Sequence, residues 1–389
     1  MFNKIKKYQR VISIPERSFF LFGPRGVGKS TWLKAHVQAA RSINLLIEST
    51  YQSFLADATL FRMQLANVKP GEFVTVDEIQ RLPQLLNDIH YLIEEKKIKF
   101  ALSGSSARKL KRAGVNLLAG RAIRKEMFPL TREELGPDFE IEKILMSGSL
   151  PLIWNADGDK EVLEAYVQTY LKEEIQAEAL VRNLPGFHRF LPIASIFNAN
   201  VINISNIARD AGIKRSTAEG YIEILEDTLL TFRLRPFEGR LRVKEKKHPK
   251  LYWIDTGIAR TAKRAFGTPA PEERGHLFES WFAATLRAYQ SYRDLFDDWH
   301  FWAPTEKSNI EVDFLLWKGE SCVAIEVKAS RTFKPEFVKG LNALRDSGKI
   351  KFNRLILVYL GNEPLRSEGI EVLPLKEILD DIESGNLWK

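Results

Sequence analysis

The stretch Gly23-Pro-Arg-Gly-Val-Gly-Lys-Ser30 lies between a compact apolar run and a segment with helical spacing. It matches the pattern G-x-x-x-x-G-K-S, in which glycines let the backbone wrap closely around phosphate oxygens. The apolar run at 17–22 is predicted to be a buried strand, and a helix is predicted to begin near Lys29. A strand, a loop and a helix in this order are the context of a P-loop. The sequence therefore predicts an α/β domain that binds ATP with Mg²⁺.

The residues of this loop have separate expected roles. Its backbone N–H groups would point at the phosphates, and the positive end of the following helix would favour their charge. Lys29 would reach the β- and γ-phosphates, Ser30 would bind Mg²⁺ through its hydroxyl, and Thr31 would lie on the α-phosphate side. The expected ATP-binding residues are Gly23, Pro24, Arg25, Gly26, Val27, Gly28, Lys29, Ser30 and Thr31.

A pair of acidic residues follows the next predicted strand. The segment 73–76 is short and β-branched, and Asp77 and Glu78 come directly after it. Asp77 is expected to hold Mg²⁺, directly or through water, and Glu78 to orient and deprotonate the attacking water. In the alternative, Asp77 only caps a helix predicted at 82–97. We favour the first interpretation because a P-loop predicts an acidic strand end further along the chain.

Two more residues are candidates for contact with the γ-phosphate. Ser103 follows the predicted strand 97–102 and would sense that phosphate, although a plain Ser/Gly turn explains the residue equally well. Arg121 follows a glycine and would reach ATP in a neighbouring subunit, which implies a homo-oligomer. An ordinary surface arginine is the alternative for Arg121.

Several segments together resemble a prokaryotic group of AAA-type ATPases, in which an AAA_14-type module precedes a DUF4143-type C-terminal region. The segments of the first domain are GPRGVGKST, VDEIQRLP, ALSGSS, LAGR and MFPLTREEL. Two later segments, KLYWIDTGIAR and RGHLFESW, match the C-terminal region. The resemblance implies an AAA-type architecture and ATP binding. Ser103 stands where the group has Thr, so the resemblance leaves its sensor role open.

The middle of the chain has the pattern of a winged helix. Helices are predicted at 204–213 and 214–225, followed by a strand and a basic hairpin-like stretch. Residues 233–250 include eight Lys or Arg and two Glu, a surplus that suits phosphate contacts. A solvated wing, a docking surface for protein and an ATPase lid are the alternatives. The candidate nucleic-acid contacts are Lys214, Arg215, Arg240, Arg242 and Lys244.

A predicted hairpin near the C-terminus places Asp313 across from Glu326 and Lys328. Because side chains alternate along a strand, Glu326 and Lys328 would share one face. This D…E-x-K pattern is typical of PD-(D/E)xK nucleases: Asp313 and Glu326 would bind Mg²⁺, and Lys328 would position the attacking water. Glu279, on a helix predicted at 274–286, would supply the further acidic residue that many such nucleases have. Degenerate members of this fold serve in binding alone.

Composition sets the remaining bounds. The net charge of +8 favours a polyanion such as DNA as a partner, and the single cysteine, Cys322, fits a reducing cytosol. Because there is no signal peptide and no run approaching ~18 apolar residues, a cytoplasmic protein without a membrane span is expected. Three domains are predicted: a P-loop AAA-type domain with a parallel sheet at 1–140, a helical and winged-helix domain at 141–248, and an α/β restriction-endonuclease-like domain at 249–389.

These features lead to one main hypothesis and its rivals. In the main hypothesis, the chain is an AAA-type ATPase, with ATP and Mg²⁺ bound, whose nucleotide state controls a DNA-directed nuclease-like domain. In the first rival, ATP regulates a binding or signalling switch, and the C-terminal domain is a non-catalytic interaction platform. In the second rival, hydrolysis is too slow to matter and ATP is a structural ligand.

Overall fold

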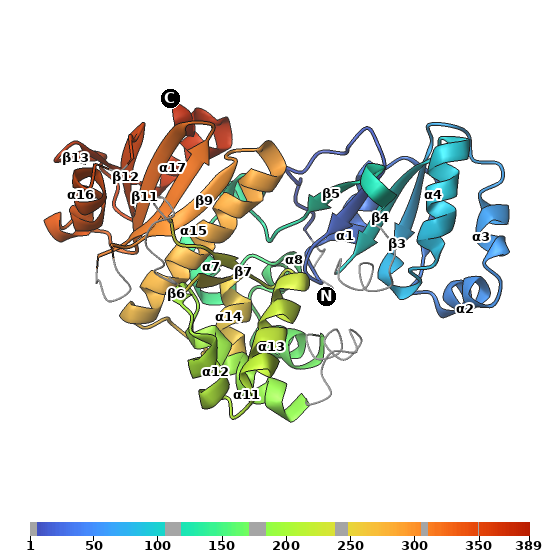
Figure 1. Ribbon diagram of the computed structural model, residues 1–389, viewed down its shortest axis with the longest axis horizontal. Helices are drawn as coiled ribbons and strands as arrows, with labels where there is room; N and C mark the ends of the chain where they lie inside the picture. The colour runs from blue at the N-terminus through green and yellow to red at the C-terminus, as the bar shows by residue number, and fades with distance from the viewer. Residues whose placement is uncertain (1–5, 106–117, 171–183, 238–247, 305–309, 349) are drawn as a thin grey trace.

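The computed structural model describes residues 6–105, 118–170, 184–237, 248–304, 310–348 and 350–389. Three of the predicted nucleic-acid contacts, Arg240, Arg242 and Lys244, lie outside the described residues. Figure 1 shows the N-terminal sheet on one side, the C-terminal sheet on the other and a group of helices below them.

The N-terminal region is a parallel sheet. Its strands are β1 (Phe19–Phe22), β2 (Ala39–Asn44), β3 (Phe73–Asp77), β4 (Lys99–Gly104) and β5 (Ile123–Glu126). They lie in the order β2-β3-β4-β1-β5, and each pairing is parallel. β1 is apolar throughout because both of its faces are buried: Phe19 and Leu21 belong to one hydrophobic cluster, and Phe20 and Phe22 belong to another. The parallel-sheet P-loop fold expected for this region is confirmed.

Helices pack on both faces of this sheet. They are α1 (Lys29–His36), α2 (Glu48–Ala56), α3 (Thr59–Gln64) and α4 (Leu85–Lys96). Trp32 of α1 packs on the face that includes Phe19, whereas α2, α3 and α4 pack on the opposite face. Since β1 and β3 are parallel members of one sheet, their carboxyl ends meet at the same edge. This edge brings the loop after β1 and the acidic end of β3 to one side of the domain.

A helical region follows the N-terminal sheet. Its helices are α6 (Arg132–Leu135), α7 (Ile141–Ser147), α8 (Pro151–Trp154), α9 (Lys160–Ala165), α11 (Leu184–Ile196), α12 (Ile204–Asp210), α13 (Arg215–Asp227) and α14 (Thr256–Ala262). A small antiparallel sheet in the order β6-β8-β7 accompanies them, with strands β6 (Asn200–Val201), β7 (Thr231–Leu234) and β8 (Lys250–Trp253). The helix pair α12–α13 thus precedes an antiparallel pair of strands.

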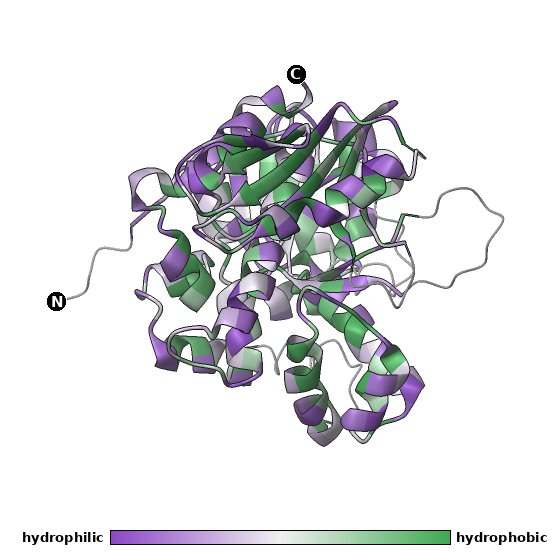
Figure 2. Ribbon diagram, turned by 90° about the vertical axis from the view of Figure 1, so that its left-hand side faces the viewer, coloured by the Kyte–Doolittle hydropathy of each residue, from purple (hydrophilic) through white to green (hydrophobic). Residues whose placement is uncertain are grey.

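The C-terminal region has a mixed sheet in the order β13-β14-β12-β11-β10-β9. Its elements are α15 (Pro271–Arg293), β9 (Asp298–Trp302), β10 (Val312–Lys318), β11 (Ser321–Lys328), α16 (Lys339–Asp346), β12 (Arg354–Tyr359), β13 (Leu365–Ser367), β14 (Ile370–Pro374) and α17 (Leu375–Ser384). β9, β10 and β11 pair antiparallel, whereas β11, β12 and β14 pair parallel. The middle strands are strongly hydrophobic, as Figure 2 shows, because α15 and α17 cover one face and α16 covers the other. The predicted α/β class of this region is confirmed.

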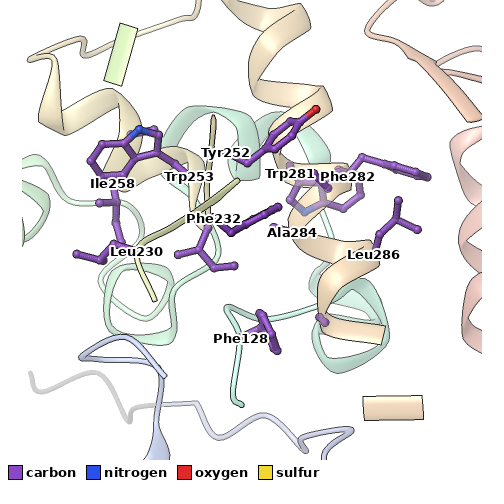
Figure 3. Close-up of a cluster of buried hydrophobic side chains, with 14 of the residues drawn as sticks. Phe128, Leu230, Phe232, Tyr252, Trp253, Ile258, Trp281, Phe282, Ala284 and Leu286 are labelled. Carbon is purple, nitrogen blue, oxygen red and sulfur yellow. The ribbon is translucent and has the colours of Figure 1, made fainter. Parts of the chain in front are cut away.

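Helix α15 packs against all three regions. It contacts β5 of the first sheet, β8 of the small sheet and β11 of the C-terminal sheet. Figure 3 shows Trp281, Phe282 and Leu286 of α15 in a buried cluster with Phe128, which follows β5, and with Phe232 of β7. Among the described residues, no helix is both long enough and apolar enough to cross a bilayer.

Candidate functional site

The loop after β1 requires glycine at three positions. Gly26 and Gly28 have φ values of 78° and 99°, which side chains other than hydrogen rarely allow. A Cβ atom on Gly23 would lie 2.6 Å from the carbonyl oxygen of Met127. The glycines of the loop therefore match a backbone that favours glycine at these positions. Helix α1 begins at Lys29, directly after the loop.

The side chain of Lys29 lies against this loop. It is buried, and its Nζ donates to the carbonyl oxygens of Gly23 at 2.6 Å and Pro24 at 3.1 Å. The Lys29 ammonium group thus lies beside the backbone of the loop and at the start of α1. A positive charge in this position suits phosphate oxygens. Ser30 is half-buried beside it in the first turn of α1, whereas Thr31 is exposed.

Asp77 and Ser103 lie together at the ends of neighbouring strands. Val76 pairs with Leu102, so the next residue of each strand falls side by side. Ser103 Oγ donates a hydrogen bond to Asp77 Oδ1, and both side chains are buried. The alternative that Asp77 caps a helix is wrong, because α4 begins only at Leu85 and no side chain caps it. Ser103 is inside β4 rather than in a turn after it.

Glu78 occupies an unusual backbone conformation directly after β3. Its φ of 60° is in the left-handed region, which is uncommon for a residue with a side chain. Its backbone N–H donates to Ser103 Oγ at 3.4 Å, and its carboxylate accepts a hydrogen bond from Gln80 Nε2. Gln80 is buried and also donates to Ser105 Oγ at 3.2 Å. Gln80 could have been found in the sequence only from its place two residues after Glu78.

Arg121, the candidate for contact with a neighbour's ATP, forms a salt bridge within its own chain. Its Nε forms a salt bridge with Glu94 of α4 in the same chain, and the pair is partly exposed. This salt bridge lowers the pKa of Glu94. A role for Arg121 at the ATP of a neighbouring subunit stays a prediction.

The predicted D…E-x-K residues converge in the C-terminal region. The backbone N–H of Asp313 donates to Glu326 Oε2 at 3.3 Å, and the backbone N–H of Val327 donates to Asp313 Oδ2 at 2.9 Å. Lys328 Nζ donates to Glu326 Oε1, as expected for residues on one face of β11. Glu279 joins them from the third turn of α15. We refer to Glu279, Glu311, Asp313 and Glu326 as the carboxylate cluster.

A lysine from β8, which the sequence did not single out, lies within the carboxylate cluster. Lys250 Nζ is 2.8 Å from Glu279 Oε1, 3.1 Å from Glu311 Oε1 and 3.4 Å from Asp313 Oδ1. Its side chain is only 2% exposed. In the sequence, Lys250 is only the last residue of the basic stretch 233–250. Nothing there connects it with its three acidic partners, because they are distant along the chain. The ammonium group therefore lies where three carboxylates meet.

The burial and the charges of this cluster raise the pKa values of Glu279, Glu326 and Lys250. Four carboxylates face two ammonium groups, those of Lys250 and Lys328, so negative charge is in excess. Burial raises the pKa of Glu279 and of Glu326, the charge of Asp313 raises both further, and the nearby lysines oppose the shift only in part. Burial would lower the pKa of Lys250, but the surrounding carboxylates raise it well above its usual range. The raised pKa values favour the protonated forms of the two glutamates and of Lys250. This is consistent with a cluster that has more carboxylates than ammonium groups.

The described residues do not group three or more His, Cys, Asp or Glu side chains in a geometry that could hold a metal ion. In the carboxylate cluster, Lys250 and Lys328 supply positive charge to the oxygens that a divalent cation would need. The hypothesis of a Mg²⁺ site formed by Asp313 and Glu326 therefore requires Lys250 to move or to share the carboxylates with the metal.

The surface expected to contact nucleic acid has mixed charge. Lys214 and Arg215 are exposed at the start of α13, but Glu219 and Glu223 follow on the exposed face of that helix. Acidic side chains there would repel phosphates. A separate hollow of about 410 Å³ lies where β5, β7, α15 and β9 meet. Its charged lining residues are Arg124, Glu126, Arg233 and Arg287.

Three family models match successive parts of the chain. An AAA domain model, AAA_14, matches residues 15–136. DUF8612 and DUF4143, both domains of unknown function, match residues 138–268 and 274–378. The matches thus extend over most of the chain, including the loop after β1, the acidic end of β3 and the carboxylate cluster.

Individual proteins resemble the chain more weakly. An uncharacterized protein of Mycobacterium tuberculosis is 23% identical over 368 residues, covering 92% of this chain and 80% of that protein. An uncharacterized protein of Haemophilus influenzae is 20% identical and covers 96% of this chain and 97% of that protein. A RuvB variant of Thermotoga maritima, a solved structure, has a TM-score of 0.30 and 13% identity, covering 65% of this chain and 88% of that chain. The AAA_14 and DUF4143 matches bear out the resemblance seen in the sequence: an AAA domain at 15–136 precedes a DUF4143 region at 274–378 in this chain.

Proposed function

We propose that this chain is a cytoplasmic ATPase whose nucleotide state controls binding by its C-terminal region. The observation that supports a binding role is the position of Lys250, whose Nζ lies within 3.4 Å of three carboxylates. The buried ammonium group there pairs with Asp313, one of the two carboxylates that a nuclease would use for Mg²⁺. The C-terminal region would then present a partner-binding surface rather than a cleaving site.

In the proposed hydrolysis, each polar residue at the edge of the first sheet has one task. Lys29 binds the β- and γ-phosphates, while Ser30 and Asp77 hold Mg²⁺, which supplies positive charge to the phosphate oxygens. Glu78 accepts the proton of the attacking water. Gln80 orients the Glu78 carboxylate through its hydrogen bond. The hydroxyl of Ser103, which already contacts Asp77, is the proposed sensor of the γ-phosphate.

A second candidate function is a Mg²⁺-dependent nuclease directed at DNA and controlled by ATP. The observation that favours it is the convergence of Glu279, Asp313, Glu326 and Lys328 from three separate elements. The excess of carboxylates over ammonium groups would also attract a divalent cation. In this candidate Asp313 and Glu326 would hold Mg²⁺ with Lys250 displaced, the metal would supply positive charge to the phosphate, and Lys328 would position the attacking water.

The proposed partner is nucleic acid, contacted by the winged helix through Lys214 and Arg215 and by the arginines of the 410 Å³ hollow. Two of these, Arg124 and Arg287, share Glu126 as their acidic partner, which leaves the group net positive. We also propose the three domains given above, at 1–140, 141–248 and 249–389, and a homo-oligomer in which Arg121 meets the ATP of a neighbour.

ATP turnover and DNA cleavage measured side by side test the proposal. Lys29→Ala and Glu78→Gln should each lower ATP turnover, the latter by about 10²-fold or more if Glu78 is the base. Glu95→Gln is the matched control, because Glu95 is an exposed glutamate of the same domain. Equal turnover in wild type and Glu78→Gln would exclude Glu78 from catalysis.

The cleavage assay decides between the two candidates for the C-terminal region. The binding proposal expects no Mg²⁺-dependent cleavage by wild type, with or without ATP. Cleavage that Glu326→Ala abolishes would establish the nuclease instead. DNA binding titrated with salt completes the test, since no affinity even at low salt would exclude nucleic acid as the partner.

A further inference from the structure

A buried arginine near the N-terminus contacts the loop after β1. Arg10 Nη1 donates to the carbonyl oxygen of Val27 at 2.9 Å, and its Nε donates to Glu134 Oε1 at the same distance. The side chain of Arg10 is 6% exposed and that of Glu134 is fully buried. The guanidinium thus joins a loop carbonyl to a carboxylate in a segment more than a hundred residues away.

Two residues of the helical region bind the preceding carbonyls of the loop. Tyr166 OH donates to the carbonyl oxygen of Arg25 at 3.0 Å, and the backbone N–H of Leu152 donates to that of Gly26 at 3.3 Å. With Arg10 at Val27, three successive loop carbonyls accept hydrogen bonds from outside the loop. A peptide C=O and the following N–H point in opposite directions. Fixing the Val27 carbonyl toward Arg10 therefore turns the next N–H away from Arg10.

The same arginine lies beside helix α15. Arg10 Nη2 donates to Tyr292 OH at 3.4 Å, and Tyr292 OH also accepts a hydrogen bond from the backbone N–H of Phe128 at 3.0 Å. On either side of Tyr292, two residues of α15 donate hydrogen bonds to the Glu133 carboxylate. They are Arg293, through Nη2 at 2.6 Å, and Tyr289, through its hydroxyl at 3.0 Å. The C-terminal half of α15 is thus bonded to Arg10, to Phe128 and to α6.

The other half of α15 contains Glu279, which bonds to Lys250 at 2.8 Å and to Tyr252 OH at 2.7 Å. Glu279 and Tyr292 are separated by thirteen residues of continuous helix, or about 20 Å at the usual helical rise. Helix α15 therefore contacts the loop after β1 through Arg10 at one end and the carboxylate cluster at the other. We refer to this loop, residues 23–28, as the nucleotide loop.

We propose that Arg10 is a positioning residue of the nucleotide site and that its bond to Tyr292 links ATP binding to α15 and to the carboxylate cluster. The inference rests on the proposed function, because it names the route by which nucleotide state reaches the C-terminal region. ATP binding would set the loop carbonyls, Arg10 would follow Val27, and α15 would transmit the change to Glu279.

Tyr292→Phe is the informative variant, because it removes only the hydroxyl that contacts Arg10 and Phe128. Arg10→Gln removes the whole contact, and Arg17→Gln, at an exposed arginine near the same terminus, is its matched control. We expect Arg10→Gln to raise KM for ATP about tenfold with little change in kcat, as for a residue that sets ground-state binding. Arg17→Gln should leave both constants unchanged.

Amide hydrogen exchange of residues 274–286, with and without Mg²⁺ and a slowly hydrolysed ATP analogue, tests the link itself. Wild type should show exchange that depends on the analogue, and Tyr292→Phe should lose that dependence while still binding the analogue at saturation. The same dependence in Tyr292→Phe and wild type would overturn the inference even if the ATPase proposal holds. If wild type does not bind the analogue, the proposed function fails first.

Discussion

Replacing Lys250 by methionine removes a buried positive charge and keeps most of the side-chain volume. The ammonium group contacts Glu279, Glu311 and Asp313, and four carboxylates would then face Lys328 alone. Removing one partner of a buried ion pair costs about 3–5 kcal/mol. We expect Lys250→Met to lose about this much unfolding free energy at neutral pH. The loss should be smaller near pH 5, because protonated carboxyl groups need no counter-charge.

Urea denaturation followed by tryptophan fluorescence measures this loss, with Lys339→Met as the control at an exposed lysine of the same region. Millimolar Mg²⁺ should restore part of the stability of Lys250→Met, because the freed carboxylates are hard oxygen ligands, and should have no such effect on wild type. A loss within about 0.5 kcal/mol of the Lys339→Met control, which is typical of surface changes, would refute the role given to Lys250. Stabilisation of wild type by Mg²⁺ would instead favour the nuclease.

Three other predictions concern single residues. Ser103→Ala should slow ATP turnover more than it weakens ATP binding, because the Ser103 hydroxyl orients Asp77. A variant whose kcat/KM and ATP affinity fall by the same factor would contradict this. Burial raises the pKa of Glu279 to about 7, so the unfolding free energy should fall as pH rises from about 4.5 to 7. In denaturation curves at several pH values, Glu279→Gln should flatten that slope, and an unchanged slope would count against the assignment. Arg215→Gln should reduce the salt dependence of DNA binding by about one unit in a log–log plot, as for one lost phosphate contact, while Arg17→Gln should not.

The residues that sequence alone located are those whose signal is local. The P-loop and the Asp77–Glu78 pair each occupy one short stretch beside a recognisable strand, and both predicted strands form. The E-x-K pair follows from alternation along one strand, and Asp313 follows from a hairpin with a short turn. In each case a few neighbouring residues determine the geometry.

The residues that sequence missed depend on contacts between distant segments. Arg10 lies 124 positions from Glu134, and Lys250 lies 63 positions from Asp313, so no spacing pattern connects either pair. The helix-cap alternative for Asp77 failed for a related reason. A short turn of helix at 79–81 separates β3 from α4, and local propensity did not predict it.

The hydrogen bonds to the carbonyls of Arg25, Gly26 and Val27, in the loop after β1, bear on how far this protein can be truncated. The AAA_14 match begins at residue 15 and ends at residue 136. Arg10, Leu152 and Tyr166 all lie outside those limits, yet each bonds to the loop. A fragment trimmed to the match would keep the P-loop, Asp77 and Glu78 but lose these three groups that bond to the loop backbone. The backbone of the nucleotide loop is therefore held partly by residues outside the segment that sequence similarity marks as the AAA domain.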